Sequence, residues 1–477
     1  MLNLREIVKA NDIRGLVGSQ LDDRVVRALG TAFARRELAS GAERLVIGHD
    51  MRDSSPRLSE AFALGARSEG LPVVHMGLCS TDALYYASGA LAAPGAMFTA
   101  SHNPAAWNGM KLCRSGARPV GLDSGLAEVR DLAQALLDDP AWPVDGDGAP
   151  PAAEERRDLL PGYAGHLRSL VDLSGIRPLR VVVDAGNGMA GMTTPAVLGS
   201  AAGLALPPVE VIPLYFELDG TFPNHEANPL DPKNLLDLQA AVPQYGADLG
   251  LAFDGDADRC FVVDERGEAV NPSAVSALVA TREIAKELAA GRQPTVIHNL
   301  ITSRAVPEVI REAGGTAVRT RVGHAFIKAE MAAADAVFGA EHSAHYYFRD
   351  FWYADTGMLA ALHVLAALGE QSEPLSVLLS VHQRYAASGE INFRVPDVAQ
   401  ALELVAAAFA ADPGVVQERL DGLTVADGPV DGDGAWWFNV RPSNTEPMLR
   451  LNVEAGDRPT MEALRDRVRG VLAGIAG

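Results

Sequence analysis

The sequence predicts an α/β fold: three related α/β domains, each a mixed sheet between helices, and a smaller C-terminal α+β domain, arranged around a central cleft. Three observations lead to this prediction. First, 477 residues are too many for a single hydrophobic core, so two to four domains are expected. Second, strand, polar loop, helix and strand alternate in three separate stretches, which is typical of α/β domains. Third, the last part of the chain follows a different pattern.

The first α/β stretch begins with a short apolar strand at Leu45–Gly48. A polar loop follows, and its last residue, Ser55, is expected to cap a helix that has Pro56 at its first position. The helix should end at Gly70, because glycine is common just after the last helical residue. A second strand is expected at Leu71–Met76.

The same order of elements recurs twice further along the chain. The second stretch contains a glycine-rich loop, and the third has a Gly-Gly pair before its last strand. The elements expected in these stretches are Leu179–Asp184, Thr194–Gly203, Val209–Leu214, Thr295–His298, Val306–Ala313 and Thr316–Thr320. Because the spacing between the copies is irregular, the pattern indicates duplicated domains rather than a solenoid.

The C-terminal stretch has two expected strands, Trp436–Val440 and Met448–Val453, followed by a helix at Thr460–Ile475. This pattern predicts the smaller α+β domain. A segment rich in Gly, Pro and Ala, Asp145–Glu155, is expected to link the first two domains. The predicted domains are residues 1–150, 151–266, 267–383 and 384–477.

Composition narrows the class of protein. The formal net charge of −20 argues against nucleic acid and anionic membranes as partners. No apolar run approaches the roughly 18 residues that span a membrane. The three cysteines form no CxxC pattern, which indicates reduced thiols in a cytoplasmic protein. Because the chain as a whole is strongly negative, an anionic substrate would need cationic side chains concentrated in one place.

The first chemical motif is Thr99–Pro104, Thr-Ala-Ser-His-Asn-Pro, which follows an apolar strand. A short turn there would expose Ser101 at a strand end, where α/β active sites gather. Taken alone, the motif favours a plain surface turn of Ser, Asn and Pro, so it needs support from other segments. A serine hydrolase is disfavoured because GxSxG is absent and His102 is expected to point away from Ser101.

The second motif is Asp254–Arg259, Asp-Gly-Asp-Ala-Asp-Arg. Its three carboxylates, at alternate positions of a tight loop, can converge on one hard cation, with Gly255 easing the turn. A solvated acidic loop is the plain alternative. An EF-hand is rejected because Arg259 stands where that loop needs glycine, and because strands are expected on both sides.

Two further motifs lie in the C-terminal half of the chain. Arg441–Thr445, Arg-Pro-Ser-Asn-Thr, offers a guanidinium, hydroxyls and an amide, which suit a phosphate group, although a β-turn alone would also explain it. In Glu341–His345, Glu-His-Ser-Ala-His, Glu341 and Ser343 alternate and can bind neighbouring sugar hydroxyls. Zinc is disfavoured there because HExxH is absent.

Together these four segments resemble the α-D-phosphohexomutases, and within them the phosphomannomutase/phosphoglucomutase branch, over the whole chain and in the same order. The resemblance implies that Ser101 is a phosphoserine. It implies a Mg²⁺ site formed by Ser101, Asp254, Asp256 and Asp258. It also implies a sugar site at Glu341 and Ser343, and a phosphate site at Arg441, Ser443, Asn444 and Thr445.

Shorter matches extend the resemblance to Asp12–Gly15 (DIRG), Asn108–Lys111 (NGMK) and Val322–His324 (VGH). The resemblance implies that Arg14, Lys111 and Arg259 steady the transferring phosphoryl group. It further implies that Lys111 or His324 supplies or removes the proton of the sugar hydroxyl.

The reaction implied by the resemblance is reversible exchange of hexose 1-phosphate and hexose 6-phosphate. Phosphorylated Ser101 gives its phosphoryl group to the sugar, which forms a 1,6-bisphosphate. This intermediate then reorients in the site, so that its other phosphate returns to Ser101. Mg²⁺ and glucose or mannose 1,6-bisphosphate as activator are the implied cofactors. The implied partner is a small sugar phosphate, and the chain is expected as a monomer or homodimer. Since Glu341 and Ser343 would hold O3 and O4, both C2 epimers should react.

The sequence also departs from this branch. Asn11 stands where many relatives have an aromatic residue, and His49 stands where an arginine is frequent. Leu300 stands where some relatives have a lysine that contacts the sugar, and Arg304 is expected to substitute for that lysine. Phosphoglucosamine mutase is the nearest alternative, but its glutamine between Glu341 and Ser343 is replaced here by His342. A phosphatase, or a sugar-phosphate binding protein without activity, are further alternatives.

Overall fold

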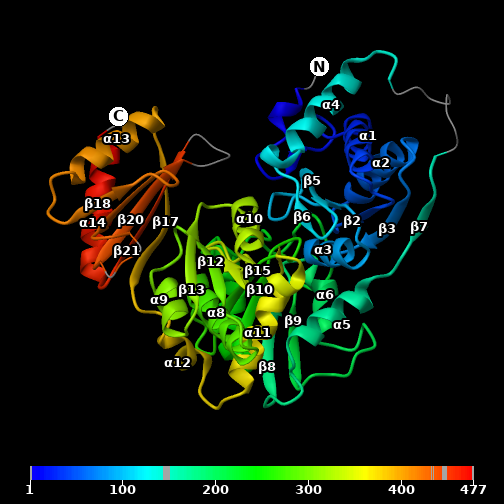
Figure 1. Cartoon of the computed structure of the whole chain (residues 1–477). Coiled ribbons are helices and arrows are strands. Elements are labelled where there is room, and N and C mark those ends of the chain that lie inside the picture. The colour runs from blue at the N-terminus through cyan, green and yellow to red at the C-terminus, as the bar shows by residue number, and fades with distance from the viewer. Residues whose placement is uncertain (1–2, 143–150, 431, 433, 443–447, 475–477) are drawn as a thin grey trace. The chain divides into compact units, whose positions relative to one another are not determined.

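The structure is a computed structural model that describes residues 3–142, 151–430, 432, 434–442 and 448–474. The chain divides into two compact units. Unit 1 comprises Met1–Val275 and Ser343–Leu378, and unit 2 comprises Ser276–His342 and Leu379–Gly477. Figure 1 follows the chain through both. None of the helices described is long and apolar enough to cross a membrane.

Unit 1 begins with a mixed seven-stranded sheet in the order β1-β5-β4-β2-β3-β7, with β6 paired to β5. β2, β3, β4 and β7 run parallel, whereas β5 is antiparallel to both β1 and β4. The strands are β1 (Ile13–Leu16), β2 (Leu45–His49), β3 (Val73–Leu78), β4 (Gly95–Phe98), β5 (Trp107–Arg114), β6 (Arg118–Pro119) and β7 (Glu154–Arg156). The parallel strands therefore end at one edge of the sheet, where the Ser101 loop follows β4.

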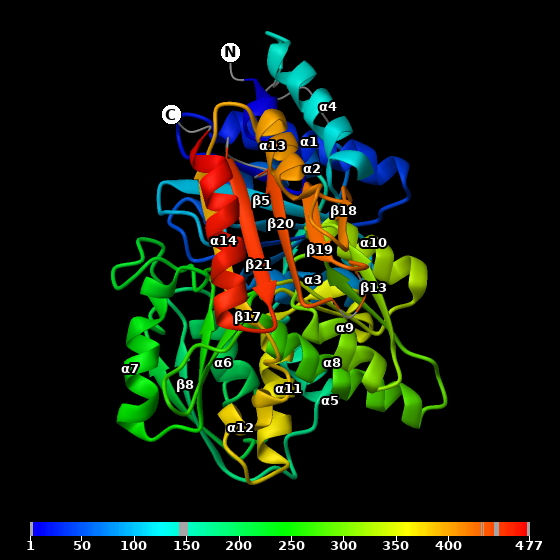
Figure 2. The same ribbon diagram turned by 90° about the vertical axis from the view of Figure 1, so that its left-hand side faces the viewer.

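Helices α1 (Asp23–Ala39) and α2 (Ser55–Ser68) lie side by side, as both views show (Figures 1 and 2). Glycines permit this close contact. A Cβ on Gly30 would lie 2.2 Å from the Phe62 carbonyl oxygen, and one on Gly65 would lie 2.2 Å from that of Arg27. The remaining helices of this part are α3 (Thr81–Ala90) and α4 (Leu126–Asp138).

The second sheet of unit 1 has the order β11-β10-β8-β9. β9, β8 and β10 are parallel, and β11 returns antiparallel to β10 through the Asp254 loop. The elements are α5 (Leu160–Leu170), β8 (Leu179–Asp184), α6 (Ala190–Val197), β9 (Val209–Leu214), α7 (Leu236–Tyr245), β10 (Leu249–Phe253) and β11 (Cys260–Asp264). β8 and β10 are almost wholly buried, as expected for apolar parallel strands.

A later segment completes unit 1 with β15 (Tyr346–Phe348), β16 (Ala354–Asp355), α11 (Gly357–Gly369) and α12 (Leu375–Ser380). Every residue of α11 is buried, because its sequence is apolar on all sides. Short 3-10 helices occur at Leu4–Glu6, Leu122–Ser124, Pro232–Leu235 and Arg349–Phe351.

Unit 2 contains a parallel set of strands and an antiparallel sheet. The parallel strands lie in the order β13-β12-β14, and the antiparallel sheet in the order β17-β21-β20-β19-β18. α13 and α14 cover one face of the antiparallel sheet, as Figure 2 shows, and Phe409, Phe438 and Val468 belong to the core beneath them.

The bounds in unit 2 follow the chain in order. They are α8 (Pro272–Ala289), which begins at the end of unit 1, β12 (Thr295–Asn299), α9 (Ala305–Glu312), β13 (Thr316–Thr320), α10 (His324–Ala334), β14 (Phe338–Ala340), β17 (Ala386–Arg394), α13 (Val398–Phe409), β18 (Val415–Glu418), β19 (Leu423–Asp427), β20 (Trp436–Pro442), β21 (Met448–Ala455) and α14 (Arg458–Ala473).

The predicted fold class is confirmed: mixed sheets are flanked by helices, and the C-terminal part is an antiparallel sheet with helices. Two local expectations are wrong. The helix expected at Thr194–Gly203 is α6, which begins at Ala190 and carries Pro195 in its interior. The cap of α2 is Ser54 rather than Ser55, and its side chain makes no capping hydrogen bond.

Candidate active site

The Ser101 loop is held in place by a buried arginine. Arg52, just beyond β2, donates from Nη2 to the carbonyls of Ser101 at 2.9 Å and Asn103 at 2.6 Å. Its Nη1 donates to the carbonyls of Pro104 and Trp107, both at 3.0 Å. The guanidinium is itself paired with buried Asp50, at 3.2 Å. Arg52 therefore binds four carbonyls of one loop at once.

The expectation that Ser101 is exposed is wrong: its exposed fraction is 3 %. Its backbone is left-handed, with φ of 50°, a conformation that costs a non-glycine residue about 1–3 kcal/mol. The loop compensates by a hydrogen bond of 2.8 Å from the Ser101 N–H to Thr99 Oγ1. Ser101 Oγ donates to Asp254 Oδ2 at 2.8 Å, which joins the serine to the acidic loop.

The acidic loop connects the antiparallel strands β10 and β11. Strands therefore lie on both sides of it, as predicted, where an EF-hand would have helices. Gly255 has a different role from the one expected. Its φ is not left-handed, whereas that of Ala257 is, at 61°. A Cβ on Gly255 would instead lie 2.5 Å from the Ser101 carbonyl oxygen. The glycine allows the two loops to touch.

The carboxylates of Asp254, Asp256 and Asp258 are buried, and one oxygen of each lies within 4.8 Å of the others. Burial raises the pKa of Asp254, and burial together with Asp256 raises the pKa of Asp258 to about 6. Burial opposes charge on Asp256 as well, but Lys111 outweighs it and lowers that pKa. The cluster thus concentrates negative charge that a cation would stabilise.

These residues fit a magnesium ion. Oδ1 of Asp256 and Oδ1 of Asp258 are buried and accept no hydrogen bond from any residue that the structure describes. Hard divalent cations prefer carboxylate oxygens, and unpaired buried acceptors are costly without a ligand. Ser101, hydrogen-bonded to Asp254, lies beside this donor set.

Lys111 and Arg259 bring positive charge to the same loop. Lys111 Nζ, on β5, donates to Asp256 Oδ2 at 2.7 Å and Asp258 Oδ2 at 2.5 Å. Burial opposes this charge, but the two carboxylates hold the pKa of Lys111 well above its usual value. Arg259 Nε donates to Asp254 Oδ2 at 2.9 Å.

The expectation that His102 points away from Ser101 is wrong, since its Nδ1 lies 3.1 Å from Ser101 Oγ. Arg259 Nη2 lies 2.7 Å from the same nitrogen and can only donate, so Nδ1 is an acceptor. Burial, then Arg259 and Arg14, holds the pKa of His102 well below its usual range. The ring is therefore neutral and already hydrogen-bonded to Arg259.

Arg14, on β1, contacts the other side of the Ser101 loop. Its Nη1 donates to Asn103 Oδ1 at 2.5 Å, and its Nε pairs with Asp12 at 2.7 Å. Together with Lys111, Arg52 and Arg259, it surrounds Ser101 with cationic side chains. Each of these four cations is paired with at least one carboxylate of the same region, so they balance the acidic side chains around Ser101.

Ser343 lies in unit 1, three residues before the start of β15. Its Oγ is 3.0 Å from His345 Nδ1, and His345 Nε2 is 3.7 Å from Asp258 Oδ1. His345 also forms a β-bridge with Arg259. Ser343 is therefore connected to the acidic loop through one histidine.

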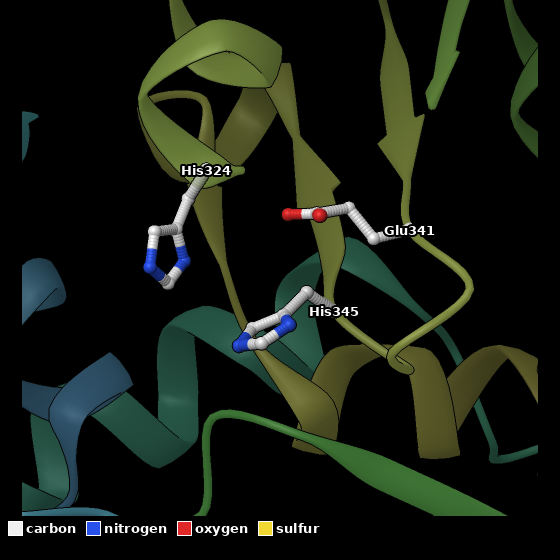
Figure 3. A group of neighbouring side chains, drawn as sticks. All are labelled: His324, Glu341 and His345. Atoms are coloured by element: carbon white, nitrogen blue, oxygen red, sulfur yellow. The ribbon is translucent and has the colours of Figure 1, made fainter. Parts of the chain in front are cut away.

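In unit 2, Glu341 follows β14 and His324 begins α10. Figure 3 shows both side chains, together with His345 of unit 1, and the Glu341 carboxylate is directed towards the side on which His324 lies. A carboxylate oxygen and a ring nitrogen of these two residues are within 4.8 Å. Glu341 Oε2 accepts from the Gly323 N–H at 3.2 Å and from Asn299 Nδ2 at 3.3 Å.

Arg441 was expected in a loop but lies within β20, where it is 4 % exposed. Its guanidinium donates to Asn452 Oδ1 at 2.7 Å and Glu390 Oε2 at 2.6 Å. These bonds orient the side chain near the end of the strand. The other residues of the phosphate-site prediction, Ser443, Asn444 and Thr445, lie outside the described residues.

Leu300 and Arg304 both contact the antiparallel sheet of unit 2. Leu300 belongs to an apolar cluster with Ile301, Ala426 and Trp437. Arg304 donates from Nη1 to the Gly434 carbonyl, and its backbone N–H donates to Glu454 at 2.9 Å. These contacts attach α9 to the antiparallel sheet, and Nε and Nη2 of Arg304 make no hydrogen bond with the described residues.

Sequence reasoning missed three residues that organise the site: Arg52, Thr81 and His345. Thr81 Oγ1 donates to Asp256 Oδ2 at 2.6 Å, and its N–H donates to the Asp256 carbonyl at 3.0 Å. The signals available were Asp50 and Arg52 directly after a buried strand, and a serine-threonine pair opening α3. Both lie at strand ends, where α/β sites gather.

Comparison with known proteins agrees with the geometry. Four segments match the phosphoglucomutase/phosphomannomutase family: residues 5–135 its alpha/beta/alpha domain I, 161–267 domain II, 271–385 domain III, and 390–471 the C-terminal domain. A relative from Xanthomonas campestris named phosphohexose mutases is 40 % identical over 98 % of this chain and 99 % of its own. A phosphomannomutase from Salmonella typhimurium is 39 % identical over 98 % of both chains.

Solved structures share the fold. A phosphoglucomutase/phosphomannomutase family protein from Burkholderia thailandensis has a TM-score of 0.85 and 29 % identity, covering 100 % of this chain and 98 % of its own. An N-acetylphosphoglucosamine mutase from Aspergillus fumigatus, solved with GlcNAc-6P and magnesium, has a TM-score of 0.65 and 14 % identity, covering 100 % and 97 %. The resemblance seen in the sequence is confirmed: the chain belongs to the phosphoglucomutase/phosphomannomutase family, whose members are enzymes that isomerise phosphosugars.

Proposed function

We propose that this enzyme interconverts hexose 1-phosphates and hexose 6-phosphates, with glucose and mannose as the sugars. The observation that carries the proposal is Ser101, hydrogen-bonded to Asp254 and surrounded by Arg14, Lys111 and Arg259. A serine in this setting can carry a phosphoryl group, because these neighbouring cationic side chains stabilise its negative charge.

The chain's own residues account for the transfer. In the first step, the bond between phosphorus and Ser101 Oγ breaks while a bond to the sugar hydroxyl oxygen forms, and the hydroxyl proton leaves. Lys111 and Arg259 stabilise the charge on the transferring group, and the second half of the reaction reverses these bonds. His324 is the side chain we propose for the proton transfer, with Lys111 as the alternative.

Magnesium is the proposed metal, held by Asp254, Asp256 and Asp258 with a phosphoryl oxygen on Ser101. Bound there, it would neutralise charge on the transferring phosphoryl group. Two solved A. fumigatus N-acetylphosphoglucosamine mutases support the cofactors by analogy: one contains magnesium and the other glucose 1,6-bisphosphate. We propose the same metal here, and glucose or mannose 1,6-bisphosphate as activator.

The remaining predicted residues would hold the sugar and its second phosphate. We propose that Glu341 and Ser343 bind O3 and O4, and that Arg441 with Ser443, Asn444 and Thr445 binds the phosphate that is not reacting. None of these groups would read C2, where glucose and mannose differ. Both epimers should then be substrates, within about a thousandfold in kcat/KM.

Phosphorus NMR tests the proposal. The protein is incubated with Mg²⁺, a trace of hexose 1,6-bisphosphate, and either mannose 1-phosphate or glucose 1-phosphate. We expect both to become 6-phosphates, and Ser101→Ala to abolish the conversion. Release of inorganic phosphate would instead indicate a phosphatase. Turnover of glucosamine 1-phosphate alone would indicate the glucosamine enzyme.

A further inference from the structure

A polar cavity lies in unit 1 at the opposite edge of the first sheet from Ser101. It has a volume of about 520 Å³, within the range of pockets that hold small metabolites. Its walls come from the end of α1, the residues just before β2 and β4, and the β5–β6 turn. Ser101 follows the other end of β4, a strand of four residues that spans about 13 Å.

Three arginines that form no close ion pair in the described part of the chain line this cavity. Arg44, Arg114 and Arg118 all contribute to the wall, and none forms an ion pair with a residue in the described part of the chain. Arg114 Nε is buried and has no hydrogen-bond partner there. The acidic side chain that two of these arginines share is Glu37: burial raises its pKa, and Arg36, Arg114 and Arg118 act against that rise.

The arginines are also held close to one another. Arg114 and Arg118 are directly opposite in the antiparallel β5–β6 pair, an arrangement that destabilises a sheet when the charges are alike. Arg114 and Arg36 both donate to the single carbonyl of Ser124. Burial, then Arg36, lowers the pKa of Arg114. Glu37 offsets part of this repulsion, and an anionic ligand between the arginines would offset more of it.

The cavity also presents hydrogen-bond acceptors. Glu37, which is 3 % exposed, contributes to the cavity wall and forms an ion pair with the preceding residue, Arg36. Glu43 and the C-terminal end of α1 at Ser40 lie on the same wall. A simple inorganic anion would offer these acceptors no donor. A ligand with hydroxyl groups beside its phosphate would bind the arginines through the phosphate and the acceptors through the hydroxyls.

We propose that this cavity is a second binding site, separate from Ser101, for a phosphorylated metabolite that carries hydroxyl groups. Arg44, Arg114 and Arg118 bind its phosphoryl oxygens, and Glu37 accepts hydrogen bonds from its hydroxyls. The cavity is separate from the proposed catalytic site, because no residue of the Ser101 loop or the acidic loop lines it.

Isothermal titration of the whole protein with ribose 5-phosphate tests the proposal, with inorganic phosphate as the comparison. We expect ribose 5-phosphate to bind more tightly than phosphate, and Arg44→Gln/Arg114→Gln to weaken its binding at least about tenfold. The matched control is Arg57→Gln/Arg180→Gln, which removes the same charge from exposed positions outside the cavity. This control should leave the affinity within about twofold.

A third variant separates the cavity from the catalytic residues. Arg441→Ala should keep the ribose 5-phosphate affinity of the cavity, since Arg441 belongs to unit 2. Loss of binding in Arg441→Ala with retention in Arg44→Gln/Arg114→Gln would overturn the proposal. So would absence of binding to the wild type, or equal weakening by the cavity variant and its charge-matched control.

Discussion

At the scale of single residues, Arg52 determines the shape of the Ser101 loop. It donates to four carbonyls from 101 to 107 and is the partner of buried Asp50. No side chain with a single donor could replace it, because the planar fork of arginine reaches several acceptors at once. Catalysis should therefore depend on this residue although it has no reacting atom.

Replacing Arg52 by Met keeps most of the side-chain volume and removes every one of these hydrogen bonds. We expect kcat/KM to fall at least about a hundredfold, and the unfolding free energy to fall by about 3–5 kcal/mol because Asp50 is left buried without its partner. Steady-state kinetics and thermal unfolding measure both. Arg57→Met on neighbouring α2, where the arginine is exposed, is the control and should change neither.

The raised pKa of Asp258 should make Mg²⁺ affinity depend on pH. Burial and Asp256 raise its pKa to about 6, so below that pH a proton competes with the metal for the carboxylate. Mg²⁺ affinity should be constant above about pH 7 and fall by up to about tenfold per unit below pH 6. Calorimetric titration at several pH values measures this, and affinity that stays level down to pH 5 would contradict it.

At the scale of elements, several strands could be predicted to the residue. Leu179–Asp184, Val209–Leu214 and Thr316–Thr320 match β8, β9 and β13, because β-branched runs bounded by polar or glycine residues carry their own signal. β17 and β18 were missed, since they alternate between half-buried and exposed residues and have no continuous apolar run. α6 was misplaced because Pro195 looks like a helix start but lies inside the helix.

Part of the candidate site could likewise be predicted from the sequence, and part could not. The acidic loop could be predicted because its three carboxylates are local, two residues apart in the chain. The contacts of Arg52 with Ser101 and of Thr81 with Asp256 join residues 49 and 175 positions apart. Such pairings arise only from the topology of the sheets, so a single sequence does not reveal them.

The contact between α1 and α2 gives a prediction at this scale. A methyl group on Gly65 would lie 2.2 Å from the Arg27 carbonyl oxygen, so Gly65→Ala must push the helices apart. We expect a loss of about 1–3 kcal/mol in unfolding free energy. Gly165→Ala, within α5, has nothing within 4 Å and should stabilise by about 0.5–1 kcal/mol. Thermal unfolding of the two variants should thus shift in opposite directions.

At the scale of the whole molecule, the proposed functional residues belong to both compact units. Ser101, the acidic loop and Lys111 are in unit 1, whereas Glu341, His324 and Arg441 are in unit 2. The proposed reaction needs both sets on one substrate. Metal binding, in contrast, needs only residues of unit 1.

This division predicts how Arg441→Ala behaves. Mg²⁺ affinity should stay within about twofold of the wild type, because the proposed ligands are in unit 1. The kcat/KM for hexose 1-phosphate should fall at least about a hundredfold, since a charge-assisted contact to phosphate is lost. Calorimetry and a coupled assay measure the two, and a parallel loss of metal affinity would contradict the assignment.

The most direct test of the central claim is to locate the phosphoryl group. The protein is equilibrated with glucose 1,6-bisphosphate and Mg²⁺, digested, and mapped by mass spectrometry, before and after a chase with excess glucose 6-phosphate. We expect one phosphorylated residue, Ser101, and loss of its phosphoryl group on the chase with matching formation of hexose bisphosphate. A phosphoryl group on another residue, or full mutase activity in Ser101→Ala, would contradict it.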